Sequence, residues 1–280
     1  MLEPDDSPSP ADLAADLPAP ERLARAQAAL QALDESAGSA AGSAAGAMTA
    51  APAPLRVLAP MALARGRVHE LAGSARQVLA VLTAVAAARE GAVLWLRPGW
   101  RAETLCPAGL RALAGGDTGL VEALIVADAR REGDILWSME EALRAGCVAL
   151  VVGEIGTAPD LRQIRRLHLA AAEGITRARA TGKAAGMPLG LLLAQERADS
   201  RIAGVESRWA FEALPPEPEA LTDRRHDIGP RWRLRRLRAR DAPPADWVID
   251  PRALSAGGLA RGRTGQDRTG GHAMTGPDKG

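Results

Sequence analysis

Apolar and polar residues follow two patterns along the middle of the chain, and these patterns predict alternating strands and helices. Continuous apolar runs bounded by glycine predict buried strands, whereas apolar residues three or four positions apart predict helices with one buried face. The predicted strands cover 66–73, 92–96, 121–127, 147–153 and 189–194, and the predicted helices cover 76–89, 107–113, 134–145 and 160–173. Strands that alternate with helices indicate an α/β domain with a doubly wound, mostly parallel sheet.

Two of the predicted helices have a clear apolar face. In helix 134–145 the inward residues are Ile135, Leu136, Met139, Ala142 and Leu143, and the outward residues are Glu140, Glu141 and Arg144. In helix 160–173 the inward residues are Leu161, Ile164, Leu167 and 169–171, and the outward residues are Arg162, Arg165 and Arg166. We expect the strand between these helices, 147–153, at the centre of the sheet because it is apolar throughout.

The pattern changes near residue 208. Segments 208–214, 231–240 and 247–250 predict short strands with no helix between them, which we expect as antiparallel additions to the sheet edge. In 231–240 arginines alternate with apolar residues, but the alternation changes phase near Arg235 and Arg236. A regular strand cannot keep both apolar sets on one side, so we predict a bulge there.

The flanks differ from this predicted domain of residues 54–250. Leucines at helical spacing predict a helix over 20–36, followed by a Gly/Ser/Ala linker over 37–46. The rest of 1–53 is predicted to be mostly disordered, and so is the tail 251–280, which contains few apolar residues. A tethered helix could dock a partner, but short isolated helices are weak in water, and both interpretations stay open.

Overall charge and cysteine content exclude few functions. The 35 basic and 34 acidic residues give a net charge of +1, which is no global signal for nucleic acid. Cys106 and Cys147 are isolated in sequence, as in proteins of a reducing compartment. The first residues are acidic and proline-rich, unlike a signal peptide, and no apolar run approaches the roughly 20 residues of a membrane span. We therefore predict a cytoplasmic protein that does not interact with membranes.

The first predicted strand leads into a turn of only four residues, Gly73, Ser74, Ala75 and Arg76. In nucleotide-binding α/β proteins this position holds a glycine-rich loop that ends in Gly-Lys-Ser or Gly-Lys-Thr. Here the turn is too short to wrap a triphosphate and has no lysine, and Arg76 is its one cation. The sequence thus predicts no nucleotide cofactor, and we expect Ser74 to cap helix 76–89 instead.

Other polar residues give no firm catalytic or metal site. Glu70 and Glu154 follow predicted strands and could form a metal or acid–base pair, or could pair with arginines or cap helices. The four histidines, His69, His168, His226 and His272, have no ligand spacing. We predict no catalytic residue and no metal site.

The strongest candidate surface is the basic run in 231–240. Its arginines are Arg231, Arg233, Arg235, Arg236, Arg238 and Arg240. They could bind single-stranded DNA or an acidic partner, or they could protect a solvated edge strand against aggregation. Trp209, Trp232 and Trp247 are expected in the core, whereas Trp100, in a Pro-Gly loop, is expected at the surface and is added to this candidate surface.

Several stretches, taken in their order and spacing over about 55–250, resemble the ImuA family. They are Gly66–Gly73 (GRVHELAG), Trp137–Gly146 (WSMEEALRAG), Val151–Glu154 (VVGE), Arg165–Ala171 (RRLHLAA), and the pairs Arg208-Trp209 and Arg231-Trp232.

The resemblance implies a RecA-like core with a degenerate phosphate loop and a role in SOS-induced, error-prone translesion DNA synthesis. In that role the chain is a non-catalytic adaptor between an ImuB-type, Y-family-like partner and an error-prone replicative-type polymerase, with single-stranded DNA or RecA as further possible contacts. Relative to working recombinases, Arg97-Pro98-Gly99 stands where the catalytic glutamate is expected. Glu154 follows the strand of the magnesium-side acid, and Gln195 matches the nucleotide-sensing glutamine.

Two alternatives remain open. One is an atypical ATPase of the RecA superfamily, in which Arg76 would supply the cation of the phosphate site. The other is a regulator similar to SulA-like cell-division inhibitors.

Overall fold

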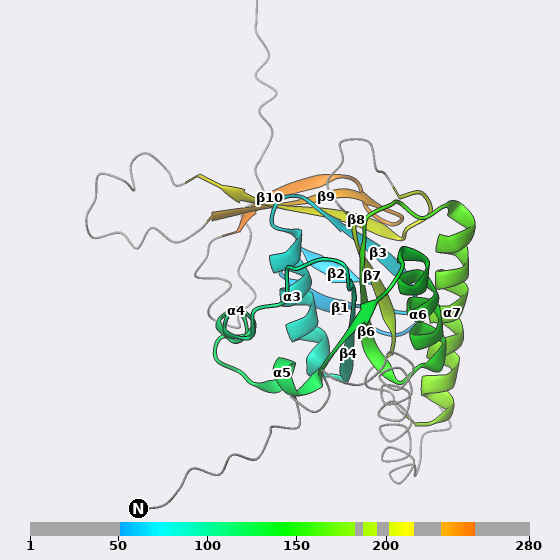
Figure 1. The fold of residues 1–280 in the computed structure, drawn as a ribbon. Coiled ribbons are helices and arrows are strands. Elements are labelled where there is room, and N and C mark those ends of the chain that lie inside the picture. The colour runs from blue at the N-terminus through cyan, green and yellow to red at the C-terminus, as the bar shows by residue number, and fades with distance from the viewer. Residues whose placement is uncertain (1–50, 183–186, 195–201, 216–230, 250–280) are drawn as a thin grey trace, which may run out of the picture.

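The computed structural model describes residues 51–182, 187–194, 202–215 and 231–249, which form a mixed α/β fold around one large sheet (Figure 1). Its strands are β3 (Val68–Ala72), β4 (Ala92–Pro98), β5 (Leu124–Ala129), β6 (Val148–Ile155), β7 (Leu189–Ala194), β8 (Ser207–Leu214), β9 (Arg231–Ala239) and β10 (Ala245–Ile249). The helices are α3 (Arg76–Ala88), α4 (Pro107–Leu113), α5 (Gly119–Ala123), α6 (Glu132–Ala145) and α7 (Leu161–Ala180). The predictions for 20–36, 37–46, 251–280, Gln195, His226 and His272 lie outside the described residues.

The eight strands of the sheet lie in the order β10-β9-β8-β3-β7-β6-β4-β5. All neighbours from β8 to β5 pair in parallel, and β9 and β10 are antiparallel additions. The predicted parallel sheet and its central strand 147–153 are therefore confirmed. The prediction that 208–214 is an antiparallel addition is only half right, because β8 pairs in parallel with β3 on one side and antiparallel with β9 on the other.

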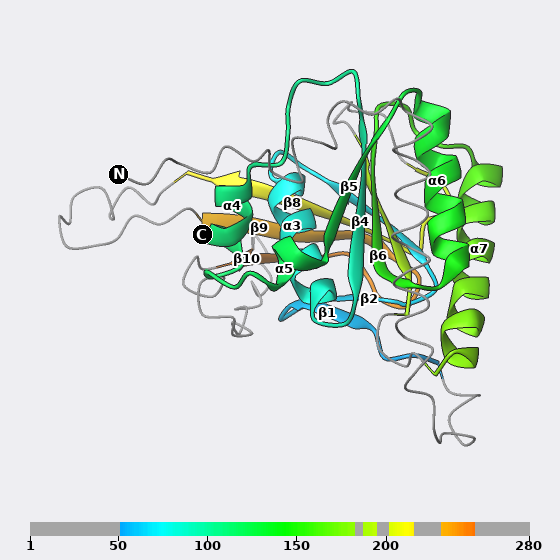
Figure 2. The ribbon, with the colours of Figure 1, turned by 60° about the horizontal axis from the view of Figure 1, so that its bottom comes forward.

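Helices cover both faces of the parallel strands (Figure 2). On one face α3, α4 and α5 pack with the small hairpin of β1 (Leu55–Leu58) and β2 (Met61–Leu63), around a core that includes Leu79, Trp95 and Phe211. On the other face α6 and α7 enclose a second core that includes Met139, Val151 and Ile164. The sequence pattern did not predict the β1–β2 hairpin. No helix among the described residues is long and apolar enough to cross a membrane.

Several element boundaries differ from the predictions. Residues 119–123 form α5, so the third strand begins at Leu124 rather than at residue 121. Helix α7 begins at a capping box, in which Asp160 and Gln163 each accept a hydrogen bond from the other's backbone N–H at 2.8 Å. It continues seven residues past the predicted end at 173, because Ile175 and Ala178 extend its buried face.

Two apolar residues predicted to face inward on α7 are exposed instead. Leu161 is 61% exposed and Leu169 is 62% exposed, whereas Ile164 and Leu167 are buried. Leu161 is the first residue of α7, and Leu169 lies on the exposed side of the helix. The buried side of α7 is thus narrower than its sequence suggested.

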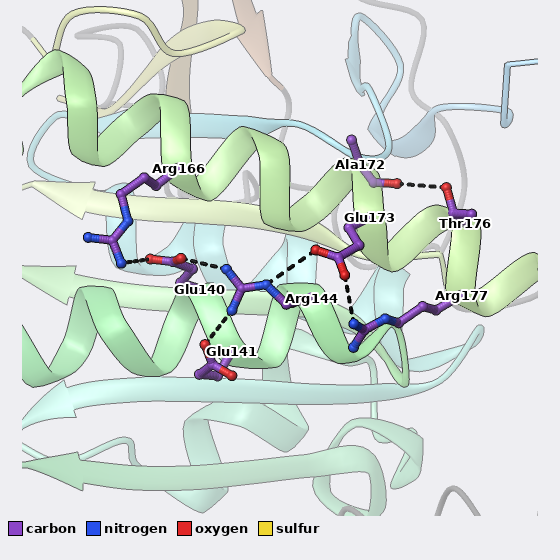
Figure 3. A network of polar contacts seen from close by, with 8 residues as sticks. All are labelled: Glu140, Glu141, Arg144, Arg166, Ala172, Glu173, Thr176 and Arg177. Carbon is purple, nitrogen blue, oxygen red and sulfur yellow. Dashed lines mark hydrogen bonds and ion pairs between the residues drawn. The ribbon is translucent and has the colours of Figure 1, made fainter.

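Helices α6 and α7 are joined by a network of ion pairs (Figure 3). Arg166 lies 2.7 Å from Glu140, Arg144 lies 3.3 Å from Glu173, and Arg144 also pairs with Glu140 and Glu141. Glu140 was predicted to face outward, but only 8% of it is exposed, because it points along the seam between the two helices. Gly146 ends α6 in a left-handed conformation, with φ +69°.

Candidate functional site

The turn after β3, where a nucleotide-binding protein would hold its phosphate loop, packs directly against β8. Gly73 has φ +91°, and a Cβ atom there would collide with the backbone of Phe211. The N–H of Ala75 donates to the carbonyl oxygen of Phe211 at 2.9 Å, and the N–H of Arg76 donates to that of Gly73 at 3.2 Å. These two amides are therefore already bonded within the protein.

Ser74 was predicted to cap the helix that follows this turn, and it does not. The N-cap of α3 is Ala75, and no side chain caps the helix, so the predicted capping role of Ser74 is wrong. Ser74 is exposed. Arg76, the one cation of the turn, donates from Nη1 to the carbonyl oxygen of Gly73 at 3.2 Å. Its guanidinium group thus folds back onto the turn that it follows.

At the carboxyl ends of β4, β5 and β6, charged side chains bond to one another or to tryptophan. Arg97 is buried, its Nε lies 2.8 Å from Oδ1 of Asp128, and its Nη2 donates to the carbonyl oxygen of Arg101 at 3.1 Å. Glu154 accepts a 2.7 Å hydrogen bond from Nε1 of Trp95. Among the described residues there is no cluster of metal-ligating side chains.

Glu70 and Glu154 do not form the carboxylate pair that the sequence left open. Strand β7 separates their strands, and their side chains belong to opposite faces of the sheet. Residues two positions apart in a strand share a face, so Glu70 lies on the face of Val68, in the core beneath α6 and α7, and Glu154 lies on the face of Val152, in the core beneath α3. Glu70 is fully buried, and its Oε1 lies 3.1 Å from Nε of Arg208 on β8. The predicted pairing with an arginine is therefore confirmed for Glu70, whereas Glu154 bonds to tryptophan.

Burial shifts the pKa values of two neighbouring residues of β3 in opposite directions. Desolvation raises the pKa of Glu70 to about 7, although the charge of Arg208 and a hydrogen bond from the backbone of Ile202 oppose this shift. Desolvation also lowers the pKa of His69 to about 4. The imidazole of His69 lies 2.7 Å from Oγ of Ser207 and 2.9 Å from the carbonyl oxygen of Ala64. With both ring nitrogens bonded inside the domain, His69 acts as a structural residue.

The arginine-rich strand β9 is not the edge of the sheet, since it lies between β8 and β10. The predicted bulge is confirmed and falls at Leu237, because Trp209 pairs with Arg236 and Arg208 pairs with Arg238. By alternation and register, one face of these strands carries Arg208, Arg231, Arg233, Arg235 and Arg238. We call this set the basic face.

Three carboxylates partly neutralise the basic face, and one of them is Glu70, which pairs with Arg208 as described above. Glu212 on β8 bonds to Arg235, and Asp246 on β10 lies 3.7 Å from Nε of Arg233. Arg240, just beyond β9, lies 3.8 Å from Glu206. The Nε–H groups of Arg233 and Arg235 donate hydrogen bonds to no described atom. These two Nε atoms are themselves buried, so what the basic face retains for a partner is positive charge.

Arg236 belongs to the opposite face, with the tryptophans. Its guanidinium carbon lies 5.7 Å from the ring centre of Trp209 and 5.4 Å from that of Trp247, and its Nε donates to the carbonyl oxygen of Pro243 at 2.8 Å. The two rings are stacked with centres 5.9 Å apart, and Trp232 stacks on Phe211 at 5.1 Å. The prediction that these three tryptophans pack with the core is confirmed. None of them is on the basic face.

Trp100 is 55% exposed, as predicted, but it follows β4 and lies far across the sheet from β9. The structure therefore does not bring Trp100 to the basic face. A second exposed tryptophan, Trp137 on α6, is 50% exposed and was not predicted. Its helical position, opposite Met139, was the signal that could have identified it.

No protein-family model matches the chain, and no curated protein gives a significant match.

Proposed function

We propose that this chain is a non-catalytic, RecA-like adaptor in SOS-induced, error-prone translesion DNA synthesis, as its resemblance to the ImuA family implies. In this role it bridges an ImuB-type, Y-family-like partner and an error-prone replicative-type polymerase. The basic face is the surface to which we assign an acidic partner.

The observation that carries this proposal is the closed turn at Gly73. A phosphate loop needs free backbone N–H groups and a cation that point at the phosphates. In this chain the N–H groups of Ala75 and Arg76 are bonded to carbonyl oxygens, and the Arg76 guanidinium bonds to the carbonyl oxygen of Gly73. Opening this turn for a nucleotide would break its contacts with β8. The closed turn therefore favours a protein that binds partner proteins over one that binds and hydrolyses ATP.

The arrangement of the sheet also supports the proposal. A mostly parallel sheet covered by helices on both faces is compatible with the RecA-like core that the resemblance implies. The resemblance aligns Arg97 with the position at which working recombinases carry a catalytic glutamate, and the guanidinium group of Arg97 is bound to Asp128. That carboxylate is therefore paired with a buried cation and is a poor base for activating water.

The test is reconstitution of the full chain with an ImuB-type protein and the error-prone polymerase, in the presence and absence of ATP. We expect a stable complex that does not need ATP. We also expect the substitutions R233Q and R235Q on β9 to weaken the complex at least tenfold. The same change of charge on α7, R162Q with R165Q, should have little effect.

Nucleotide titration of the isolated chain distinguishes the alternatives. ATP binding tighter than millimolar that is lost in R76Q would replace the adaptor with an atypical ATPase. Cell filamentation on overexpression, without a polymerase complex, would favour a SulA-like division inhibitor.

A further inference from the structure

The basic face is left uncovered by the helices of the fold. Helices α6 and α7 pack on the side of the sheet that carries the basic face (Figure 1). The strands that they contact most are β3, β7, β6, β4 and β5, not β8, β9 or β10. Val248 on β10, which shares this face by its register with Arg233, is 42% exposed. The described residues thus present a sheet surface on which Arg233, Arg235 and Arg238 are partly or fully exposed, with an apolar residue at its rim.

The chemistry of this surface favours carboxylates over nucleic acid bases. Sequence-tolerant binding of single strands depends on aromatic rings on which bases stack. Here Trp209, Trp232 and Trp247 lie on the other side of the sheet, where they stack with one another, with Phe211 and with Arg236. The basic face has guanidinium groups but no aromatic ring. Two carboxylates of the chain itself, Glu212 and Asp246, already pair with its arginines, and an acidic partner could bind in the same way.

The chain itself contains a segment of matching charge. Residues 1–21 include six carboxylates and no lysine or arginine, and these carboxylates are Glu3, Asp5, Asp6, Asp12, Asp16 and Glu21. Residues 22–50 connect this segment to the described domain. A chain of that length spans up to roughly 90 Å, several times the roughly 16 Å radius of gyration of a domain of this size. The segment can therefore reach every face of the domain.

We propose that the acidic segment, residues 1–21, binds the basic face of its own chain and competes there with acidic partners. Tethering gives the segment an effective concentration of at most the millimolar range, so an affinity of about 4 kcal/mol is needed to keep it bound half of the time. An exposed ion pair contributes at most about 1 kcal/mol, so at least four of the six carboxylates have to engage the basic face. A partner would then have to displace the segment. This inference concerns the chain alone and holds whatever the identity of the partner.

The experiment places a photo-crosslinking residue, p-benzoylphenylalanine, at Ser9 of the full chain and maps the products by mass spectrometry. We expect crosslinks within one chain to peptides of β8, β9 and β10. Their yield should fall several-fold in 0.5 M salt, because the Debye length falls below the roughly 10 Å of 0.1 M salt. Crosslinks that map mainly to other faces would overturn the proposal.

Paired variants test whether charge directs the contact. R231Q with R233Q and R238Q should lower the crosslink yield at least threefold, and R162Q with R165Q on α7 should not. Because the arginine variants could affect folding of β9, a second variant carries D5N, D6N, D12N and D16N outside the described domain, and it should cause the same loss. Full yield in this variant, or crosslinks between isotope-labelled and unlabelled copies only, would refute binding within the chain.

Discussion

Gly73 lies so close to Phe211 that the backbone of β8 occupies the space where any other residue would place its Cβ atom. The same Phe211 carbonyl oxygen accepts the N–H of Ala75, so the turn before α3 and strand β8 hold one another in place. This contact joins segments that are more than 130 residues apart in the sequence.

The first prediction concerns this contact. Gly73→Ala should lower the free energy of unfolding by about 2–4 kcal/mol, because it adds a collision with backbone to the strain of a positive φ. Gly116→Ala is the matched control, since Gly116 has φ +87° and no atom within 4 Å of its Cβ position. It should cost only about 1 kcal/mol. Equal losses in the two variants, measured by urea denaturation, would show that the contact with β8 is unimportant.

The second prediction follows from the raised pKa of Glu70. A carboxyl whose pKa rises to about 7 in the folded state binds more protons folded than unfolded between pH 4.5 and 7. The stability that it contributes is therefore complete below pH 4.5 and is lost as the pH rises through 7. The difference in unfolding free energy between the wild type and Glu70→Gln should shrink with rising pH by up to about 3 kcal/mol. A difference that is constant from pH 4.5 to 8 would contradict this.

The third prediction has the opposite sign. His69 is held neutral in a chain in which Trp209 donates to Ser207, Ser207 to His69 Nδ1, and His69 Nε2 to Ala64. Its pKa falls to about 4, so the unfolded state binds more protons between pH 4 and 6.5. Stability should therefore be lost as the pH falls through this range, by up to about 3 kcal/mol.

The matched comparison for the third prediction is His69→Gln, measured by denaturant titration at several pH values. The advantage of the wild type over this variant should decrease as the pH falls from 6.5 to 4. His168, whose pKa is also lowered by burial, remains in both proteins and cancels in the difference. If the advantage instead increased at low pH, His69 would have to be protonated in the folded state.

The elements that the sequence predicted well are those with strong local signals. Strand 189–194 and helix 107–113 match their predicted ranges, since an apolar run defines the first and Pro107 with Gly115 bounds the second. The β1–β2 hairpin was missed because its strands of four and three residues are too short to show a period. Residues 121–123 continue the apolar pattern of β5, which hid the end of helix α5.

The candidate site depended on contacts that no local pattern contains. The sequence identified the short turn at Gly73 and the arginine run of β9, but it could not show that Phe211 fills the space beside the turn. A bulge at Leu237 rather than one or two residues earlier decides that Arg235 lies on the basic face and Arg236 on the tryptophan face. A shift of one residue in a strand moves side chains to the other face, so arginines next to one another in sequence have different roles.

The last prediction separates those roles. Arg236 contacts both Trp209 and Trp247 and donates to the carbonyl oxygen of Pro243, so Arg236→Ala loses a cation–π contact, a hydrogen bond and packed methylene groups. We expect a loss of about 1–3 kcal/mol in unfolding free energy and a change in near-UV circular dichroism from the tryptophans. Arg238→Ala, two residues away and exposed, should change stability by less than about 0.5 kcal/mol. If both variants were equally stable, the stacked tryptophans would not need the guanidinium group of Arg236.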